Sequence, residues 1–537
     1  MAITVTGLTT HTQTGGGTWL DVGGGGGSSA NTDVFVSSTG SRARKVSNGT
    51  KGFLYEVNAA GTSLANRVIA IRWATLAGVG ALNTRALGGV AIRLQDTSGN
   101  QSDYYVDGND TYGGGWQVSV IDTSLTESAN NGTAATMTAI RYVGVVWDET
   151  ASVGGGDPNC FIDEILSFAN TGLTVSGNTT DLIGDLQAWD DTGDYGLFET
   201  RSGQVFCKAN FDLQPDASDM SSTGDNLIFE NPVYDDGTNI SACLTELGFT
   251  CSDADNVTLT RCNIIANRNT ENITGTDSNR EIDISGATDF DLDTCSLFGF
   301  DGTNAVSLGG SGQSISFTTF NTCGQVTAGA AVFRDCVFRN AVEAAGAFFW
   351  DENTDMVDCV FFSDTTGYGI QYRPTGAGPF TETFDGIAMN SYGSDETVNA
   401  AIHINPVTTT ATITINVQNS STPTTDEDAG YTGTFSIQQT VTVKVTVQDA
   451  SGANITGARV YMIADSGGDL SEGTEILNAD SNGSGIVQDT GFSFTNIQPV
   501  TGRVRKGSAP IYYKTGVISS TITNNGLDLN VILIEDQ

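Results

Sequence analysis

The chain has few basic residues for its length. Its 537 residues include 23 Lys and Arg against 62 Asp and Glu, which gives a formal net charge of -39. Proteins that bind nucleic acid need a basic surface, so this class is excluded for most of the chain. Apolar stretches are also short, and none approaches the ~18 residues that a membrane-spanning helix requires. We therefore expect no nucleic-acid partner and no membrane span.

Histidine is nearly absent, since the chain holds only His11 and His403. Neither has a G-x-S-x-G nucleophile motif nearby, and the chain has no P-loop, no G-x-G-x-x-G that opens a helix and no H-E-x-x-H. Both histidines are therefore read as structural residues. The sequence assigns no catalytic, cofactor-binding or metal-binding residue, and we expect a protein that is not an enzyme and has no cofactor.

The nine cysteines are an odd number, so at least one is unpaired. They form no C-x-x-C pair, and with two histidines in the chain a zinc site is excluded. Several stand in apolar, strand-like surroundings, where a free cysteine packs as a small hydrophobic residue. The first residues show no basic start, apolar stretch or cleavage site, so we expect no secretory signal. Together these features predict folding in a reducing cytoplasm.

Charge is distributed unevenly along the chain. Residues 1–100 contain eight basic and four acidic residues, and residues 431–537 contain six basic and ten acidic ones. The middle of the chain therefore carries nearly the whole negative excess. Two interpretations stay open: a solvated acidic surface that keeps the protein in solution, or a basic N-terminal part that docks on an acidic assembly.

Residues 1–172 predict an antiparallel β-sandwich. Short alternating or apolar runs such as 68–73, 90–94, 140–147 and 160–165 have the length of strands, and polar or glycine-rich segments separate them. The rhythm Phe161-Ile-Asp-Glu-Ile165 resembles the closing strand of concanavalin-like (laminin-G-like) jelly rolls. Domains of that family often bind glycans, so the resemblance implies a surface glycan as a partner.

Residues 173–418 contain a repeated hexad of the form apolar-x-x-Cys-x-apolar. It centres on Cys262, Cys295, Cys336 and Cys359, and Phe317–Phe320 is a variant that we align with Phe320 in the cysteine position. A second short strand precedes most hexads by 11 or 12 residues, for example Ile284 before Cys295. Strands that repeat at a fixed offset predict a coil in which equivalent side chains stack inside. The pattern resembles a right-handed parallel β-helix, with the cysteines as an internal ladder.

The remaining chain predicts a linker and one small domain. Residues 419–434 are polar and contain Pro and Gly, which favours a linker. Thr440–Val447 alternates strictly between polar and apolar residues, which predicts a half-buried strand. The motif from Val447 through Asp449, Gly452 and Gly457 to Val460 resembles the carboxypeptidase-regulatory-like immunoglobulin-type fold, so residues 435–537 are predicted to form an Ig-like sandwich.

Paired carboxylates are the one pattern that would support catalysis, because glycoside hydrolysis needs two carboxyl groups on one face. Asp291 and Asp293 would share a face of a strand, and Asp351, Glu352, Asp355 and Asp358 form a second group. In so acidic a chain such pairs also arise by chance. Calcium is a second alternative, at Asp107-Gly-Asn-Asp110 and at Asp190-Asp-Thr-Gly-Asp194, beside the simpler reading of both segments as Asx-rich turns.

The whole chain thus predicts an all-β protein: a concanavalin-like jelly roll, a right-handed parallel β-helix, a linker and an Ig-like sandwich. This series resembles the exterior virion proteins of tailed bacteriophages, such as capsid decorations, head fibres, tail fibres and spikes. The resemblance implies a structural protein that is made in the host cytoplasm, binds other virion proteins and associates with itself, as a homotrimer. Two alternatives stay open: a β-helix tailspike enzyme that degrades polysaccharide, and a cellular adhesin or glycan-binding module.

Overall fold

The computed structural model describes residues 3–12, 17–23, 28–31, 41–44, 49–75, 82–107, 115–150, 160–252, 256–266, 273–302, 305–310, 312–342, 344–363, 367–468, 470–494, 497–507, 511–523 and 525–536. The chain divides into two compact units, Met1–Ala331 and Val332–Gln537. In the described residues β-strands dominate, with one α-helix and two short 3-10 helices, Arg85–Leu87 and Met137–Ala139. The predicted all-β fold is confirmed. No helix among the described residues is long and apolar enough to cross a membrane.

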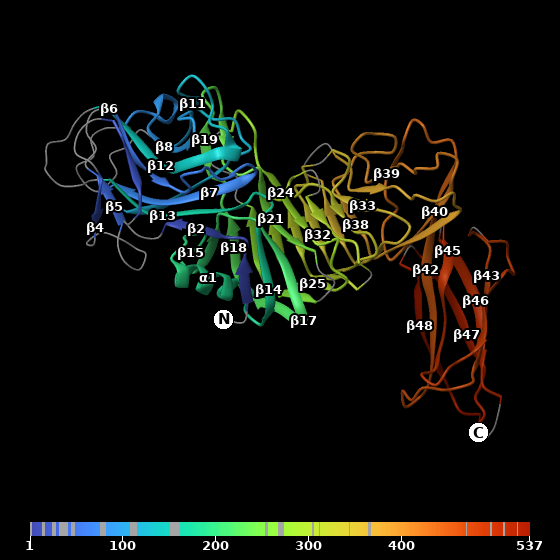
Figure 1. Cartoon of the computed structure of the whole chain (residues 1–537). Helices are drawn as coiled ribbons and strands as arrows, with labels where there is room; N and C mark the ends of the chain where they lie inside the picture. Colours follow the sequence, from blue (N-terminus) through green and yellow to red (C-terminus); the bar gives the residue numbers. More distant parts are fainter. Residues whose placement is uncertain are drawn as a thin grey trace. The chain divides into compact units, whose positions relative to one another are not determined.

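The first unit begins with a sandwich of two antiparallel sheets (Figure 1). One sheet contains β2 (Thr9–Thr12), β4 (Ser29–Asn31), β5 (Ser41–Arg44), β7 (Arg67–Thr75), β10 (Trp116–Asp122) and β13 (Cys160–Ala169). The other contains β3 (Trp19–Val22), β6 (Gly49–Glu56), β8 (Val90–Asp96), β9 (Gln101–Asp107), β11 (Ala129–Asn130), β12 (Ile140–Glu149), β19 (Val233–Asp235) and β20 (Ile240–Ala242). Large apolar side chains such as Phe53, Trp73 and Trp147 fill the space between the sheets.

Strands β19 and β20 differ from the expectation. Their residues fall within the range predicted as β-helix, yet they form an antiparallel hairpin, and Asp235 of β19 pairs with Tyr105 of β9 in the sandwich. The Tyr234 ring, which packs 6.0 Å from the Tyr104 ring, explains the docking, because it adds a buried aromatic side chain to the sandwich core.

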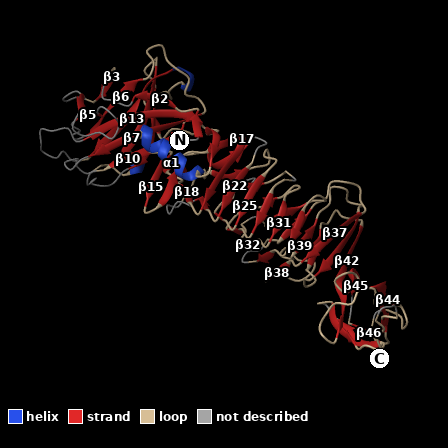
Figure 2. Cartoon of the chain, turned by 90° about the horizontal axis from the view of Figure 1, so that it is seen from below, coloured by secondary structure: helices blue, strands red, loops and turns tan. Residues whose placement is uncertain are grey.

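After β13 the chain of the first unit coils into three rows of parallel strands (Figure 2). β14 (Leu173–Thr179), which also pairs with β1 (Ile3–Thr6), leads into the long strand β17 (Phe211–Thr223). The first row is β21 (Glu246–Cys251), β24 (Asn279–Asp283), β27 (Val306–Ser307) and β30 (Val326–Thr327). The second is β22 (Val257–Thr260), β25 (Phe290–Asp293) and β28 (Ser314–Ser316). The third is β16 (Gln204–Cys207), β18 (Asn226–Phe229), β23 (Asn263–Ala266), β26 (Ser296–Phe298) and β29 (Thr319–Asn321), with β15 (Phe198–Arg201) antiparallel to β16.

Helix α1 (Leu182–Gly193) covers the open end of this coil, a role that the strand-based prediction did not include. The Asp181 side chain begins the helix by accepting a hydrogen bond from the Gly184 N–H at 3.1 Å. Leu182, Ile183 and Leu186 are buried and, together with interior residues of the first coils, line a small apolar cavity. A solenoid end exposes the apolar interior, and α1 removes it from water.

The second unit continues with parallel strands of the same kind. Its rows are β33 (Phe348–Trp350), β36 (Ile370–Tyr372), β39 (Ile402–Ile404) and β41 (Thr425–Glu427); β31 (Val332–Arg334), β34 (Asp355–Val357), β37 (Phe380–Asp385) and β40 (Thr412–Gln418); and β32 (Val337–Arg339), β35 (Val360–Phe362) and β38 (Ala388–Asn390). Part of the segment predicted as a linker is therefore a strand, since β41 pairs in parallel with β39. Its backbone hydrogen bonds complete the coil rather than face solvent.

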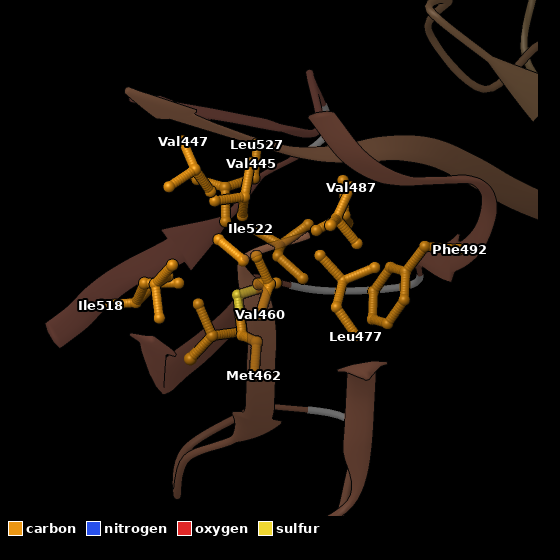
Figure 3. Close-up of a cluster of buried hydrophobic side chains, with 14 of the residues drawn as sticks. Val445, Val447, Val460, Met462, Leu477, Val487, Phe492, Ile518, Ile522 and Leu527 are labelled. Carbon is orange, nitrogen blue, oxygen red and sulfur yellow. The ribbon is translucent and has the colours of Figure 1, made fainter. Parts of the chain in front are cut away.

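A sandwich closes the second unit, and one strand connects it to the coil. β42 (Thr434–Asp449) pairs in parallel with β40 through its first residues. Its later residues pair with β45 (Ile486–Phe494) and β48 (Leu527–Leu533). The opposite sheet contains β43 (Arg459–Ala464), β44 (Glu475–Asp480), β46 (Gln498–Arg505) and β47 (Gly516–Ile522). Val445, Val447, Val460 and Met462 meet in the core between the two sheets (Figure 3).

The cysteine ladder exists, with one change of register. The nine cysteines are free and buried, and Cys262 and Cys295 occupy equivalent corners of successive coils. Leu297 pairs with Phe320, so the residue opposite Cys295 is Thr318 and not Phe320. The Thr318 hydroxyl accepts a hydrogen bond from the Cys295 N–H at 3.3 Å. Our alignment was therefore wrong by two residues, because it matched the largest apolar side chain to the cysteine rather than the small one that fits the corner.

The residue before each corner position has a left-handed backbone conformation. Its φ is +55° at Arg261, +58° at Thr294, +49° at Phe317, +55° at Asp335 and +56° at Asp358. At Arg261, Thr294, Asp335 and Asp358 the N–H of this residue donates to a carbonyl of the next coil, from Arg261 to Asp293 at 2.8 Å. The chain thus turns sharply from the second row into the third without losing a backbone hydrogen bond.

Candidate functional site

A groove on the outer face of the first row of strands contains two carboxylates from neighbouring coils. Leu247 and Phe249 of β21 are buried inside the coil, so the alternate residues Glu246, Gly248 and Thr250 lie on the outside. Strand β24 runs parallel to β21 with Glu246 opposite Asn279 and Gly248 opposite Glu281. The cavity above them has a volume of about 240 Å³. We call it the coil groove and define it by Glu246, Gly248, Asn279, Glu281 and Asn210.

The two glutamates are placed as a pair. Glu246 and Glu281 are diagonal neighbours on adjacent parallel strands, and the charge of Glu281 acts on the Glu246 carboxyl. Carboxyl pairs that hydrolyse glycosidic bonds lie roughly 5–10 Å apart. Gly248 leaves the space between them open. A Cβ at this position, where φ is +147°, would lie 1.8 Å from the Glu281 carbonyl oxygen, so the close approach of the two coils requires glycine.

The surroundings change the acidity of Glu246. Desolvation raises the pKa of its carboxyl above the ordinary value, a hydrogen bond from Asn279 Nδ2 at 3.1 Å opposes the rise, and the negative charges of Glu281 and Asp122 add to it. A carboxyl group with a raised pKa next to a second carboxylate is the arrangement that lets one group donate a proton while the other acts as base or nucleophile.

The groove also contains a buried polar atom without a partner. Asn210 is 7% exposed, and its Nδ2 donates to the Asn170 carbonyl at 2.8 Å, which fixes the orientation of the amide. Its Oδ1 has no hydrogen-bond partner. An unpaired buried acceptor of this kind costs free energy.

The carboxylates singled out from the sequence lie elsewhere. Asp291 and Asp293 share the outer face of β25, as their spacing predicts, and Asp293 Oδ1 accepts hydrogen bonds from Thr294 and Ser316. Asp355 forms an ion pair with Arg334 at 2.8 Å, and Asp358 stands in a left-handed corner. Asp293, Asp355 and Asp358 therefore have roles in the coil itself. Burial and the charges of Asp289 and Asp293 raise the pKa of Asp291, and a backbone bond from Ser314 opposes the rise.

Asp351 and Glu352 belong to a second carboxylate cluster, which the sequence did not reveal because it also needs Glu382. The Tyr372 hydroxyl donates to Glu382 Oε1 at 2.8 Å. Burial raises the pKa of Glu382, the bond from Tyr372 opposes this, and the charges of Glu352 and Asp351 add to the rise. Partial burial raises the pKa of Glu352, but hydrogen bonds from the Thr375 hydroxyl and N–H outweigh this effect and hold the pKa below the ordinary value. Because Thr375 and Tyr372 already bind the carboxylates of Glu352 and Glu382, the coil groove is the better candidate.

The histidines and the calcium candidates have structural surroundings. His11 Nε2 lies 3.0 Å from Ser167 Oγ, but Ser167 is buried and accepts a bond from Arg67 as well. Burial and then the Arg67 charge lower the pKa of His11 to about 4. The His403 ring stacks on Tyr368 with ring centroids 4.5 Å apart.

One of the two segments considered for calcium differs from the expectation, and most of the other lies outside the described residues. Residues 190–194 are not a turn but the end of α1 and its cap, where the Asp190 carboxylate binds backbone N–H groups. Asp107 ends β9, and residues 108–110 lie outside the described residues. Across the described part of the chain no group of three or more His, Cys, Asp or Glu side chains is arranged to hold a metal ion.

Comparisons with known proteins include a likeness to a solved structure. No protein-family model matches the chain, and no curated protein matches it. A solved structure, the catalytic domain of a GH87 alpha-1,3-glucanase in complex with tetrasaccharides, aligns over 82% of this chain and 86% of its own, with 13% identity and a TM-score of 0.25.

This finding overturns one expectation from the sequence. We expected a protein that is not an enzyme, and the solved chain that aligns with most of this one is a catalytic domain, so that expectation is withdrawn. At a TM-score of 0.25 the likeness transfers neither an activity nor a residue. The argument for an activity depends on the carboxylates of this chain.

Proposed function

We propose that this chain is a glycan-cleaving β-helix protein on the exterior of a tailed-bacteriophage particle, and that the coil groove binds and hydrolyses the glycan. The observation that carries the proposal is the carboxylate pair in a cavity: Glu246 and Glu281, on adjacent coils, border a space of about 240 Å³. Glycoside hydrolysis needs two carboxyl groups and room for the sugar between them.

In this proposal Glu246 is the general acid, because its raised pKa keeps more of the carboxyl protonated near neutral pH. Glu281 supplies the second carboxylate, which activates water or attacks the anomeric carbon. The Asn279 amide orients Glu246 through its bond to the carboxyl. Fixed polar groups that bind the hydroxyl groups of the sugar hold its glycosidic oxygen close to the general acid.

The placement on a virion rests on different features. The nine free, buried cysteines suit a protein that folds in a reducing cytoplasm. A net charge of -39 suits a protein that remains soluble at high copy number on a particle surface. A sandwich, a coil of parallel strands and a second sandwich give rigid parts that can dock and project. Mass spectrometry of purified particles tests this placement, since a virion protein is present in a fixed ratio to the capsid protein.

The activity is tested by release of reducing ends from a panel of neutral glucans, galactans, mannans and purified bacterial surface polysaccharides. We expect the full chain to cleave at least one of them, and Glu246→Gln and Glu281→Gln each to lower the rate by a factor of about 100 or more. Asp291→Asn and Asp293→Asn are matched controls, because they remove carboxylates from an outer face of the same coil, and they should keep the wild-type rate. Wild-type rates in both glutamate variants, or no cleavage of any polymer, would contradict the assignment.

A further inference from the structure

A second cavity in the first unit lies where the sandwich meets the start of the coil. Strands β7 and β10 form one side of it, and the end of α1 with β15 forms the other (Figure 2). The cavity has a volume of about 330 Å³, at the lower end of the range for small-molecule sites. We call it the junction pocket. Its lining includes Arg72, Trp116, Asp190, Asp191, Glu199 and Arg201.

The walls of the junction pocket are held in place by buried charged groups. The Asp190 carboxylate accepts hydrogen bonds from the Gly196 N–H at 3.0 Å and the Leu197 N–H at 2.7 Å, which fixes the loop between α1 and β15. Gly196 has a φ of +72°, and a Cβ there would lie 2.8 Å from Arg72 Nη2 and 2.5 Å from Val118 Cγ2. Arg72 is only 7% exposed, so its guanidinium is a buried charge beside an open space. Such a preformed site needs little reordering to bind a ligand.

Charges of both signs surround the space. Arg72 attracts Asp190 and Glu199, and Arg201 forms ion pairs with Glu199 and Glu230. Asp191 and Asp194 add two further carboxylates. An anionic ligand would face the carboxylates, and a cationic ligand would face the guanidinium groups. A neutral ligand whose groups both donate and accept hydrogen bonds meets neither penalty, because its hydroxyls can donate to carboxylates and accept from arginine.

Trp116 adds an apolar surface to this polar lining. Its ring lies 6.4 Å from the Phe161 ring at an angle of 64°, an edge contact that restricts its movement, and the side chain is still partly exposed. Ligand sites commonly combine an aromatic surface with a few fixed polar groups. A pyranose ring has both matching parts, with hydroxyl groups at its rim and C–H groups on its faces.

We infer that the junction pocket binds one neutral saccharide unit, and that it does so separately from the coil groove. None of its lining residues belongs to the groove. The site therefore goes beyond the proposed cleavage: it would hold glycan without cutting it, and binding would persist even if the groove proved inactive.

The test uses the full chain and monosaccharides as probes. Glucose, galactose, mannose and N-acetylglucosamine are titrated at up to 10 mM, beside glucuronic acid, galacturonic acid and glucosamine, and binding is followed by saturation-transfer NMR. We expect at least one neutral sugar to bind. Its charged counterparts should bind with an affinity lower by a factor of about ten or more. Absence of binding by all four neutral sugars, or equal binding of the charged ones, would overturn the inference.

Variants locate the binding. Trp116→Ala should weaken it about tenfold or more, whereas Trp116→Phe, which keeps a ring, should retain most of it. Arg72→Met should also weaken the binding, and thermal unfolding shows whether that variant folds. If it does not fold, the comparison of Trp116→Ala with Trp116→Phe still tests the site. Glu246→Gln should leave the binding that depends on Trp116 intact while it lowers cleavage by a factor of about 100 or more, so failure of one site is distinguishable from failure of the other. Wild-type binding by Trp116→Ala would refute the site.

Discussion

The buried carboxyl of Asp190 should make the first unit more stable in mild acid. Burial raises its pKa from 3.8 to about 6, although the N–H groups of Leu197, Phe198 and Gly196 and the Arg72 charge act in the opposite direction. The folded chain therefore holds the proton more tightly than the unfolded chain does. The stabilisation is fully present below pH 3.8 and is lost as the pH rises through about 6. At 1.36 kcal/mol per pH unit, the whole difference amounts to about 3 kcal/mol.

Only part of this difference falls in a convenient range. Between pH 7 and pH 5 the same two pKa values give a gain of about 1.3 kcal/mol in the unfolding free energy. Asp190→Asn cannot titrate, so it should lack this gain. It also turns one amide N–H toward a backbone N–H, which costs about 1–3 kcal/mol at either pH. The wild-type advantage over Asp190→Asn should therefore grow by about 1.3 kcal/mol from pH 7 to pH 5.

Urea unfolding at the two pH values, followed by tryptophan fluorescence, measures this change directly. Many other carboxyl groups titrate in the same range, but they are common to both proteins and cancel in the difference. Asp191→Asn, which alters the exposed neighbour on the same helix, is the control and should show the wild-type dependence on pH. An advantage that stays constant or shrinks toward pH 5 would refute the reasoning.

Two further predictions concern the coils. Phe338 is 1% exposed and stacks on Phe361 with ring centroids 4.5 Å apart. Its replacement by Ala should lower the free energy of unfolding by about 3–5 kcal/mol. A loss below about 1 kcal/mol in urea unfolding would mean that the stack is not part of the core. Phe317 is 59% exposed and has a left-handed backbone conformation. Phe317→Gly should relieve about 1–2 kcal/mol of backbone strain, while the greater freedom of glycine in the unfolded chain costs about 0.5–1 kcal/mol. Thermal unfolding should therefore show equal or higher stability. A clear fall in Tm would show that the ring packs usefully.

The coils could be predicted because their signal repeats. Each coil needs a small residue at the same corner and apolar residues on either side of it. The cysteine hexads therefore show where each coil lies in the sequence. The register at Phe317–Phe320 was wrong because loops of unequal length hide the offset, and only strand pairing shows that Thr318 is opposite Cys295. Helix α1 was missed because its role depends on the coil end that it covers.

The candidate site could not be found from local spacing. Glu246 and Glu281 are 35 positions apart in the sequence and become neighbours only when β24 stacks on β21. Asp291 and Asp293, by contrast, are close in sequence, which is the pattern that a search along one strand detects. Comparing outward-facing positions of consecutive rungs would have paired the two glutamates. The junction pocket has no such signal, because Arg72, Trp116 and Asp190 come from unrelated elements.

The sharing of β42 also bears on how the protein is made. Its first residues complete the coil of the second unit, and Val443, Val445 and Val447 belong to the sandwich core. Strand β48 pairs with β42 at these valines and is the last strand of the sandwich to be synthesised. Until residues 527–533 emerge, β42 has an open edge, which is a template for pairing with other chains. A chain that stops short would expose this edge permanently, so we expect incomplete copies to be prone to aggregation.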